Sequence, residues 1–227
     1  GADIIDIGGE SSRPGSKPIS TEEELERTIP LISKIHSNFP GTVISIDTTK
    51  SEVAEQAILS GANIVNDISG LSFDDNMVKV VSKYDVPLVV MHMQGKPETM
   101  QDAPSYNNLI EDIIFFFEER IRYATEFGVR KNQIILDPGI GFGKSYKDNF
   151  KLINQLEKFN SFKLPILIGP SRKSFIGIAL NEEPESRLEG TLAAVAAGIL
   201  RGAKIVRVHD VKQTRKVAKI IDLIRVA

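Results

Sequence analysis

The chain has 227 residues, of which 41% are hydrophobic and 26% charged, and its formal net charge is −2 at pH 7. A chain of this size can bury a sizeable core, and a charge so near zero gives no basic field for nucleic acid or a membrane surface. Cysteine is absent, which excludes disulfides and thiolate metal sites. No apolar run is long enough to span a bilayer and no signal peptide is visible, so we expect a cytoplasmic location.

Short apolar runs alternate with helical sequence along the whole chain. The runs read as strands that end in polar or glycine-containing turns, and they cover residues 3–10, 43–48, 63–70, 87–93, 133–137, 165–171 and 205–210. The first expected helices begin at Ser20 and run past Ile35, cover residues 51–60 and 75–84, and extend from the 94–104 loop to Gly128. A further helix begins at Ser145, helical sequence follows the strand of residues 165–171 through Leu200, and the last helix covers 211–226. Ser20 and Glu23 have the spacing of a capping box, and Asp148 is placed to cap the helix from Ser145.

A strand followed by a helix therefore occurs seven times, which predicts a parallel sheet. The candidates are an open doubly wound sheet and a (β/α)8 barrel. The barrel is favoured because it gathers chemical groups from the ends of all its strands, whereas an open sheet concentrates them at a switch point. Such groups end nearly every strand: Glu10, Asp47, Asn66, His92, Asp137, Ser171 and His209. No linker or low-complexity tract divides the chain, so residues 1–227 are expected to form one domain.

A barrel of this class needs one more strand than the pattern supplies. Gly61-Ala62 and Gly202-Ala203 each close a helix just before a strand, and Gly1-Ala2 has the same position before the first strand. A seven-strand arc would leave two unpaired edges, which barrels avoid. We therefore expect an N-terminal strand and helix to be missing from this sequence, so that seven of eight βα units are visible.

The loop of residues 137–144 carries the most specific chemistry. Asp137 ends an apolar strand, Pro138 and three glycines allow a tight turn and a close backbone approach, and Phe142 adds one large flat surface. A carboxylate, bare backbone and an aromatic face suit a flat, hydrogen-bonding heterocycle. The alternative is a strand-to-helix turn that merely requires glycine.

Asp47 and Asn66 end two other strands and extend this site. A carboxylate accepts two parallel N–H bonds from an amidine-like ring edge, and an amide can both donate and accept. The alternative for each residue is a side chain that bonds its own loop backbone.

Two basic stretches indicate an anion. Ser171-Arg172-Lys173-Ser174 places adjacent cations at a strand end before a helix, although a solvated basic turn is the alternative. Arg207 and His209 are two apart on one strand, so they share a face, and a phosphate or diphosphate is their natural partner. His92 is interpreted as a packed hydrogen-bonding residue, and no spacing makes a strong metal site by itself.

Together these residues resemble the dihydropteroate synthase family, the folate-pathway target of sulfonamides. The motifs that carry the resemblance, in order, are DIGGESSRPG (residues 6–15), IDTTK (46–50), NDISG (66–70), MHMQG (91–95), DPGIGFGK (137–144), SRKS (171–174) and RVHDV (207–211). The resemblance covers essentially the whole chain. It implies a (β/α)8 barrel transferase that joins p-aminobenzoate to 6-hydroxymethyl-7,8-dihydropterin diphosphate and releases diphosphate.

The resemblance also implies roles for individual residues. Those expected to hold or pack against the pterin are Asp47, Asn66, Ile68, Met91, Asp137, Phe142 and Lys173. Those expected to bind diphosphate are Arg13, Arg207 and His209. Those expected to shape the p-aminobenzoate pocket are Ser12, Pro14, Phe142 and Ser171, with Ser12 in place of the family's more usual Thr. Those expected to act in catalysis are Asp47, Asp137, Lys173, Arg207 and His209.

The resemblance further implies Mg²⁺, whose Asn ligand would lie in the missing first strand, so no metal ligand is expected in this chain. A homodimer is expected, with Phe115-Phe116-Phe117 either in the core or in a subunit contact. The rival interpretations are a non-catalytic pterin-binding paralogue and the pterin-binding domain of a corrinoid methyltransferase. The second rival has no diphosphate to bind, so Arg207 and His209 count against it.

Overall fold

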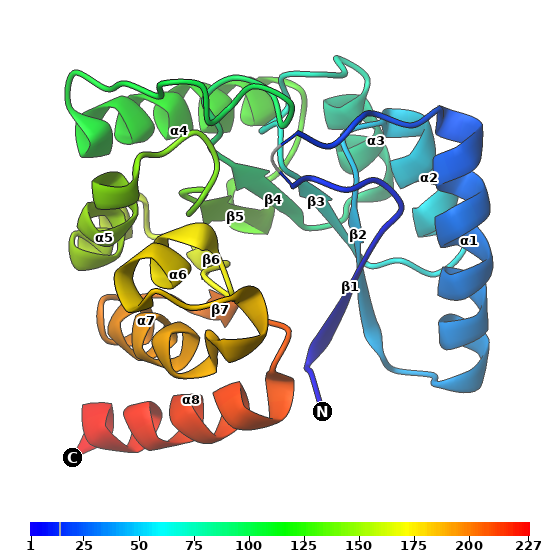
Figure 1. Cartoon of the computed structure of the whole chain (residues 1–227). Helices are drawn as coiled ribbons and strands as arrows, with labels where there is room; N and C mark the ends of the chain where they lie inside the picture. The colour runs from blue at the N-terminus through cyan, green and yellow to red at the C-terminus, as the bar shows by residue number, and fades with distance from the viewer. Residues whose placement is uncertain (14) are drawn as a thin grey trace.

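Strands and helices alternate along the computed structural model, which describes residues 1–13 and 15–227 (Figure 1). The strands are β1 (Ile4–Gly8), β2 (Val43–Asp47), β3 (Ile64–Asp67), β4 (Leu88–Met91), β5 (Ile134–Asp137), β6 (Leu167–Ile168) and β7 (Ile205–Val206). The helices are α1 (Thr21–Asn38), α2 (Ser51–Leu59), α3 (Met77–Tyr84), α4 (Leu109–Glu126), α5 (Tyr146–Asn154), α6 (Ser174–Leu180), α7 (Leu188–Leu200) and α8 (Val211–Val226). The predicted alternation is confirmed.

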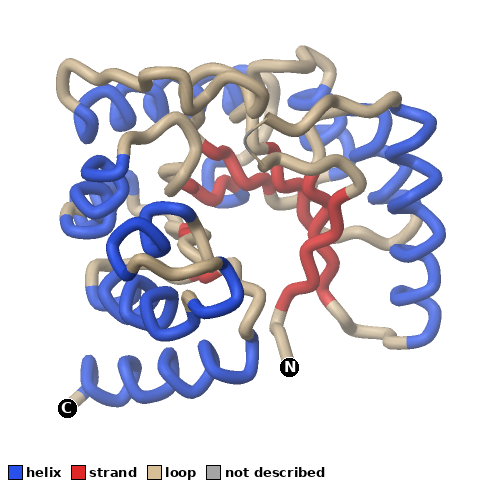
Figure 2. The backbone as a smooth tube through the Cα atoms, viewed as in Figure 1, coloured by secondary structure: helices blue, strands red, loops and turns tan. Residues whose placement is uncertain are grey.

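The strands pair in sequence order. β1 to β5 form one parallel sheet, β6 and β7 form a parallel pair, and a bridge between Leu136 and Ile166 connects the two. Figure 2 shows the strands curving around a common centre with the helices outside them. This order has no switch point, which excludes the doubly wound alternative and agrees with the predicted barrel. Among the described residues no backbone pairing joins β7 to β1, so closure of the barrel stays a prediction.

Successive side chains along each strand point to opposite faces of the sheet and therefore pack in two different places. The outward side chains pack against the helices in the main core, among them Ile44, Ile46, Val65 and Leu136. The inward side chains form a second apolar cluster contributed by six strands: Ile4, Ile64, Val89, Ile135, Leu167 and Ile205. Two residues further along each strand, the inward positions become polar in most cases. The apolar cluster is thus the floor beneath a polar ring at the carboxyl ends of the strands.

The helix caps agree only in part with those predicted from the sequence. The Ser20 hydroxyl accepts a hydrogen bond from the Glu23 N–H at 3.2 Å, but the Glu23 side chain pairs with Arg27 instead of returning to Ser20. Ser145 and Asp148 form both bonds of the capping box, as predicted. Capping therefore fixes where α1 and α5 begin.

The predicted helix that runs through Leu200 is wrong as one element. It divides into α6 and α7 because Asn181 takes the left-handed conformation at φ 56°, which ends α6, and Pro184 opens a short 3₁₀ turn before α7. The predicted strand over 165–171 is likewise shorter than expected. Pro165 and Pro170 bracket it, and neither can donate a backbone hydrogen bond.

A membrane-spanning helix is not found in the described part of the chain, since none combines the necessary length and apolar character.

Candidate functional site

The polar ring at the carboxyl ends of the strands brings together residues from opposite ends of the sequence. The Arg207 guanidinium donates from Nε to Asp6 Oδ2 at 2.5 Å and from Nη2 to Asp47 Oδ2 at 3.0 Å. The Asn66 amide approaches the same Asp6 oxygen at 3.4 Å. One cation therefore joins β1, β2 and β7 at the centre of the site.

Asp6 was not among the predicted site residues. It lies in a strand with isoleucine on both sides, and its Oδ1 atom is buried without a hydrogen-bond partner among the described residues. The available signal was its position, because an inward-facing charge two residues after Ile4 must have a partner elsewhere in the barrel. Without the fold, nothing in the sequence connected it to Arg207.

Asp47 has an unusual protonation behaviour. Burial and the neighbouring Asp6 carboxylate raise its pKa to about 7, while Arg207 opposes that shift. Asp137 is also buried, and burial raises its pKa, although the Gly139 N–H and the Lys173 ammonium favour the carboxylate. Burial therefore disfavours the charged form of both acids that are predicted to bind the ring edge of a ligand.

The loop after β5 folds back on Asp137. Asp137 Oδ1 accepts a hydrogen bond from the Gly139 N–H at 2.7 Å, which is the local bonding considered as the alternative, and it uses only one carboxylate oxygen. Phe142 is half-buried, and the Lys173 Nζ lies 4.4 Å from the centre of its ring. Burial lowers the Lys173 pKa to about 8, and its amine donates to the Ile140 carbonyl. A flat ring placed here meets a carboxylate, an ammonium and an aromatic face.

The Lys144 side chain is buried against this loop and bonds to its backbone. The sequence showed Lys144 only as the last residue of the 137–144 motif and did not indicate this role. Its side chain is 2% exposed, and its Nζ contacts His92 Nδ1 at 2.8 Å, the His92 carbonyl at 3.1 Å and the Phe142 carbonyl at 2.9 Å. Three acceptors match the three N–H bonds of an ammonium, although burial lowers the Lys144 pKa. His92 is buried, as its interpretation as a packed hydrogen-bonding residue predicted.

The basic turn after β6 divides into two parts. Arg172 forms two hydrogen bonds with the Asp210 carboxylate, at 3.0 and 2.7 Å, so it is engaged within the protein, while Lys173 faces the ring. Ser171 is buried, and its hydroxyl contacts His209 Nδ1 at 2.9 Å. His209 itself is exposed, and burial together with the cations Arg172 and Arg207 lowers its pKa. Arg207 contacts Asp6 and Asp47, whereas His209 contacts Ser171, so the two side chains share no partner among the described residues.

The loop after β1 closes one side of the ring. Ser12 is partly buried, and Ser12, Asp47 and Ile68 line one narrow cavity together with residues of the β1 and β2 loops. Arg13 is exposed, and Met91 is buried at the end of β4. Pro14, predicted to shape the p-aminobenzoate pocket, lies outside the described residues. No three His, Asp or Glu side chains of the described residues are arranged to hold a metal ion.

A parallel barrel with paired carboxylates, an amide and two cations at its strand ends defines a class of protein that binds a flat, polar heterocycle. Comparison with known families agrees, since the pterin binding enzyme family matches residues 1–209. The chain therefore belongs to the pterin-binding enzyme family.

Its relatives within that family are dihydropteroate synthases. The chain is 49% identical over 225 residues to the dihydropteroate synthase of Clostridium beijerinckii, covering 99% of this chain and 81% of the relative. It is 43% identical over 222 residues to that of Escherichia coli, covering 98% and 78%.

Solved structures give the same result. The Yersinia pestis dihydropteroate synthase with a sulfonamide drug complex superposes with a TM-score of 0.97 at 40% identity, covering all of this chain and 82% of that one. The Xanthomonas albilineans dihydropteroate synthase with 4-aminobenzoic acid superposes at 0.94 and 38% identity, covering 100% and 81%. At these identities the likeness extends to the barrel fold and to the type of enzyme, a transferase.

Proposed function

We propose that this chain is the barrel of a dihydropteroate synthase, which condenses 6-hydroxymethyl-7,8-dihydropterin diphosphate with p-aminobenzoate to give 7,8-dihydropteroate and diphosphate. The observation that carries the proposal is the polar ring, in which Asp47, Asn66 and Asp137 lie with Lys173 and Arg207 at one end of the barrel. The relatives at 43–49% identity support the same reaction.

The pterin is assigned to the carboxylate side of the ring. Asp137 keeps one oxygen beyond its bond to Gly139, and Asp47 and Asn66 stand across the barrel from it, so the three can accept from and donate to the polar edge of the ring. Ile68, Met91 and Phe142 supply the apolar surfaces that pack against it. Lys173 supplies a donor that bonds the Ile140 carbonyl and can exchange this acceptor for an electron-rich ring atom.

The diphosphate and the aromatic acid are assigned to the adjoining part of the ring, around Arg207 and the loop after β1. Arg207, His209 and Arg13 are the cationic or donor groups there, and a diphosphate can compete with Asp6 and Asp47 for the Arg207 guanidinium. The p-aminobenzoate pocket is assigned to Ser12, Pro14, Ser171 and the edge of Phe142.

In the reaction, the amine nitrogen of p-aminobenzoate forms a bond to the exocyclic carbon of the pterin as the C–O bond to diphosphate breaks. The oxygen keeps the bonding electrons, and the amine then loses a proton to solvent. The neutral amine needs little general-base help, so the barrier lies in C–O cleavage. Asp47 and Asp137 stabilise the positive charge that develops on the pterin, and Arg207 and His209 stabilise the leaving anion. Catalysis is then mostly positioning and electrostatics.

Mg²⁺ is proposed to enter with the diphosphate, whose oxygens are ligands that it prefers. Among the described residues no three His, Asp or Glu side chains are grouped to hold a metal ion, so Mg²⁺ would take ligands from the diphosphate and would stabilise the leaving anion together with Arg207 and His209. The check is calorimetry of inorganic diphosphate with and without Mg²⁺, alongside turnover in the presence of a chelator. Equal binding and turnover without the metal would remove Mg²⁺ from the proposal.

Turnover tests the function directly. The protein is mixed with the pterin diphosphate and p-aminobenzoate, and both dihydropteroate and diphosphate are measured. A non-catalytic paralogue would bind 6-hydroxymethylpterin but release no diphosphate. A corrinoid methyltransferase domain would bind a methylated pterin and ignore p-aminobenzoate, and the position of Arg207 and His209 at the ring argues against that candidate.

The chain is also proposed to form a homodimer through α6 and α7. Residues 190–200 of α7 contain no charged side chain, and Ala193 and Leu200 on this helix are exposed. Ile178 and Leu180 on α6 are exposed as well. An apolar helix surface of this kind is covered by a partner in a stable protein.

A further inference from the structure

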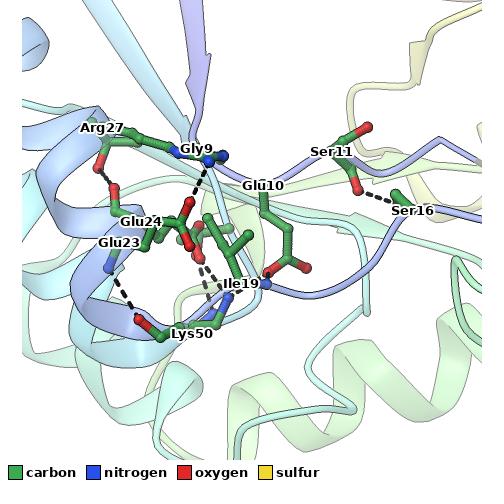
Figure 3. A network of polar contacts seen from close by, with 12 residues as sticks. Gly9, Glu10, Ser11, Ser16, Ile19, Glu23, Glu24, Arg27 and Lys50 are labelled. Carbon is green, nitrogen blue, oxygen red and sulfur yellow. Dashed lines mark hydrogen bonds and ion pairs between the residues drawn. The ribbon is translucent and has the colours of Figure 1, made fainter.

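A second ion cluster lies behind the polar ring, at the base of the loop of residues 11–18. The Lys50 ammonium, at the turn between β2 and α2, contacts the Glu10 carboxylate at 2.7 Å and the Glu24 carboxylate at 2.5 Å. Glu10 begins the loop, and Glu24 lies in the first turn of α1 that follows it (Figure 3). None of these three side chains has a role in the function proposed above.

Glu10 connects both ends of the loop. Its Oε2 atom accepts hydrogen bonds from Lys50 and from the Ile19 N–H, the latter at 3.1 Å. Glu10 precedes the loop and Ile19 follows it, so this one carboxylate bonds the two ends of the loop to each other. The Arg27 side chain donates to the Gly9 carbonyl at 2.8 Å, as Figure 3 shows. A Cβ atom at Gly9 would lie 2.9 Å from the Glu24 Cγ, so the strand end is also packed directly against α1.

Glu24 is a costly residue for a purely structural contact. Its side chain is 1% exposed, and among the described residues its Oε1 atom has no hydrogen-bond partner. An apolar residue at such a site commonly gives equal or greater stability than a buried ion pair. A buried carboxylate with one unsatisfied oxygen therefore indicates a requirement other than stability, and its ion partner in the described part of the chain is Lys50.

The loop held at this base has an exposed outer part. Ser11 and Arg13 are exposed, Ser12 turns toward the cavity that Asp47 also lines, and the Gly15 N–H donates to the Pro97 carbonyl at 3.2 Å. The outer part also forms a turn of its own, in which the Ser16 hydroxyl donates to the Ser11 carbonyl at 2.5 Å and the Ser16 N–H donates to the Arg13 carbonyl at 3.0 Å. Because such a turn keeps its own shape, its placement at the polar ring depends on the base that holds its two ends.

We propose that Lys50, Glu10 and Glu24 are positioning residues that hold the 11–18 loop so that Ser12 and Arg13 face the second substrate and the diphosphate. This inference rests on the proposed function, in which those two residues contact p-aminobenzoate and diphosphate. Glu10 and Glu24 line the same narrow cavity as Ser12 and Asp47, but their bonds to Lys50 and Ile19 hold them at the base of the loop, through which the three residues act.

The test compares Glu10→Gln and Lys50→Met with a matched control, Glu55→Gln. Glu55 forms a 2.8 Å pair with Lys83 between α2 and α3, outside the polar ring, so this control removes the same charge from a similar pair. For both loop variants we expect the KM for p-aminobenzoate to rise roughly tenfold or more, as misplacement of a substrate contact does. In Glu10→Gln the dissociation constant of 6-hydroxymethylpterin should stay within about twofold, since Glu10 is not among the groups that shift the pKa of the pterin-binding Asp47. Lys50→Arg should restore most of the lost affinity because it keeps the cation, and Glu55→Gln should change neither constant.

Hydrogen exchange supplies a readout that does not depend on activity. Faster amide exchange confined to residues 11–19 in Lys50→Met supports the inference, even if the wild-type protein fails to make dihydropteroate and the proposed function falls. Unchanged exchange there overturns it. A lower melting temperature with unchanged KM, or an equal loss of pterin and p-aminobenzoate binding, also overturns it, because the cluster would then be a general structural brace.

Discussion

Asp137 accepts one hydrogen bond from its own loop through Oδ1 and is buried at the end of β5, and its second oxygen is the atom proposed to bind the pterin. Replacing it by asparagine preserves the shape but turns one acceptor into a donor. We predict that Asp137→Asn binds 6-hydroxymethylpterin more weakly by roughly 2–5 kcal/mol, the cost of a lost charged and buried hydrogen-bond pair. Calorimetry measures this. An unchanged affinity, with the fold intact by circular dichroism, would remove Asp137 from the site.

Asp47 predicts a pH dependence in the same binding reaction. With a pKa of about 7, its carboxylate forms as the pH rises through 7, so pterin affinity should increase over that range. The charged groups that face it are Asp6, Asp67, Glu24, Lys173 and Arg207. The same ionisation should lower the free energy of unfolding as the pH rises, because the folded pKa lies above the ordinary value of 3.8.

Arg207 makes this pH dependence testable, since it lowers the Asp47 pKa. Arg207→Met should therefore move the rise in pterin affinity to higher pH, and it should also weaken binding of diphosphate-bearing ligands. Affinity measured from about pH 5.5 to about pH 9 checks the shift. Asp47→Asn is the control, because an amide does not titrate and the rise should disappear. An identical rise in Asp47→Asn would assign the titration to another group.

The sequence predicted the members of the polar ring better than their contacts. Asp47, Asn66 and Asp137 were found because each ends a strand, and parallel strands end on one side. Lys173 was found in the basic turn that follows a strand, and Arg207 by its spacing of two residues from His209. Their partners were not found, because Arg207 pairs with Asp6 across almost the whole chain. The individual roles of the ring residues stay predictions.

At the scale of elements, the loop after β5 depends on one glycine. Gly139 has φ 71°, and a Cβ atom there would lie 1.9 Å from the His92 carbonyl oxygen, which belongs to the backbone and cannot move away. We predict that Gly139→Ala abolishes pterin binding and lowers the melting temperature by several degrees.

Gly41→Ala is the matched control for this substitution. Gly41 also has a positive φ, 91°, but its Cβ would meet nothing within 4 Å. The control should cost only the backbone strain, about 1–2 kcal/mol, and should leave pterin affinity unchanged. Equal effects of the two alanines would show that the clash with β4 is unimportant.

The boundary of a helix could be predicted where the residues that set it lie close together in the sequence. Capping at Ser145 was predicted correctly because both partners lie within one turn. The break between α6 and α7 was missed although residues 181–187, NEEPESR, interrupt the apolar periodicity and include Asn181 and Pro184, which end α6 and open the following turn.

At the scale of the whole molecule, the architecture was predictable because seven βα repeats with polar strand ends allow few arrangements. The connection between β7 and β1, the two ends of the arc of strands, was not predictable. In the described residues it consists of side chains: Arg207 binds Asp6, and Arg215 donates to the Gly1 carbonyl at 2.6 Å. Contacts of this kind depend on the final positions of β1 and β7 and have no local signature.

The proposed dimer gives the last prediction. Ile178 is 63% exposed on α6 beside the uncharged surface of α7, and Leu59 is 62% exposed on α2. If a second copy covers α6 and α7, Ile178→Glu places a charge in a desolvated contact and should shift the protein from dimer to monomer in light scattering. Leu59→Glu removes a similarly exposed apolar side chain elsewhere and should leave the dimer intact. A wild-type monomer, or dissociation by both variants, would contradict the proposed interface.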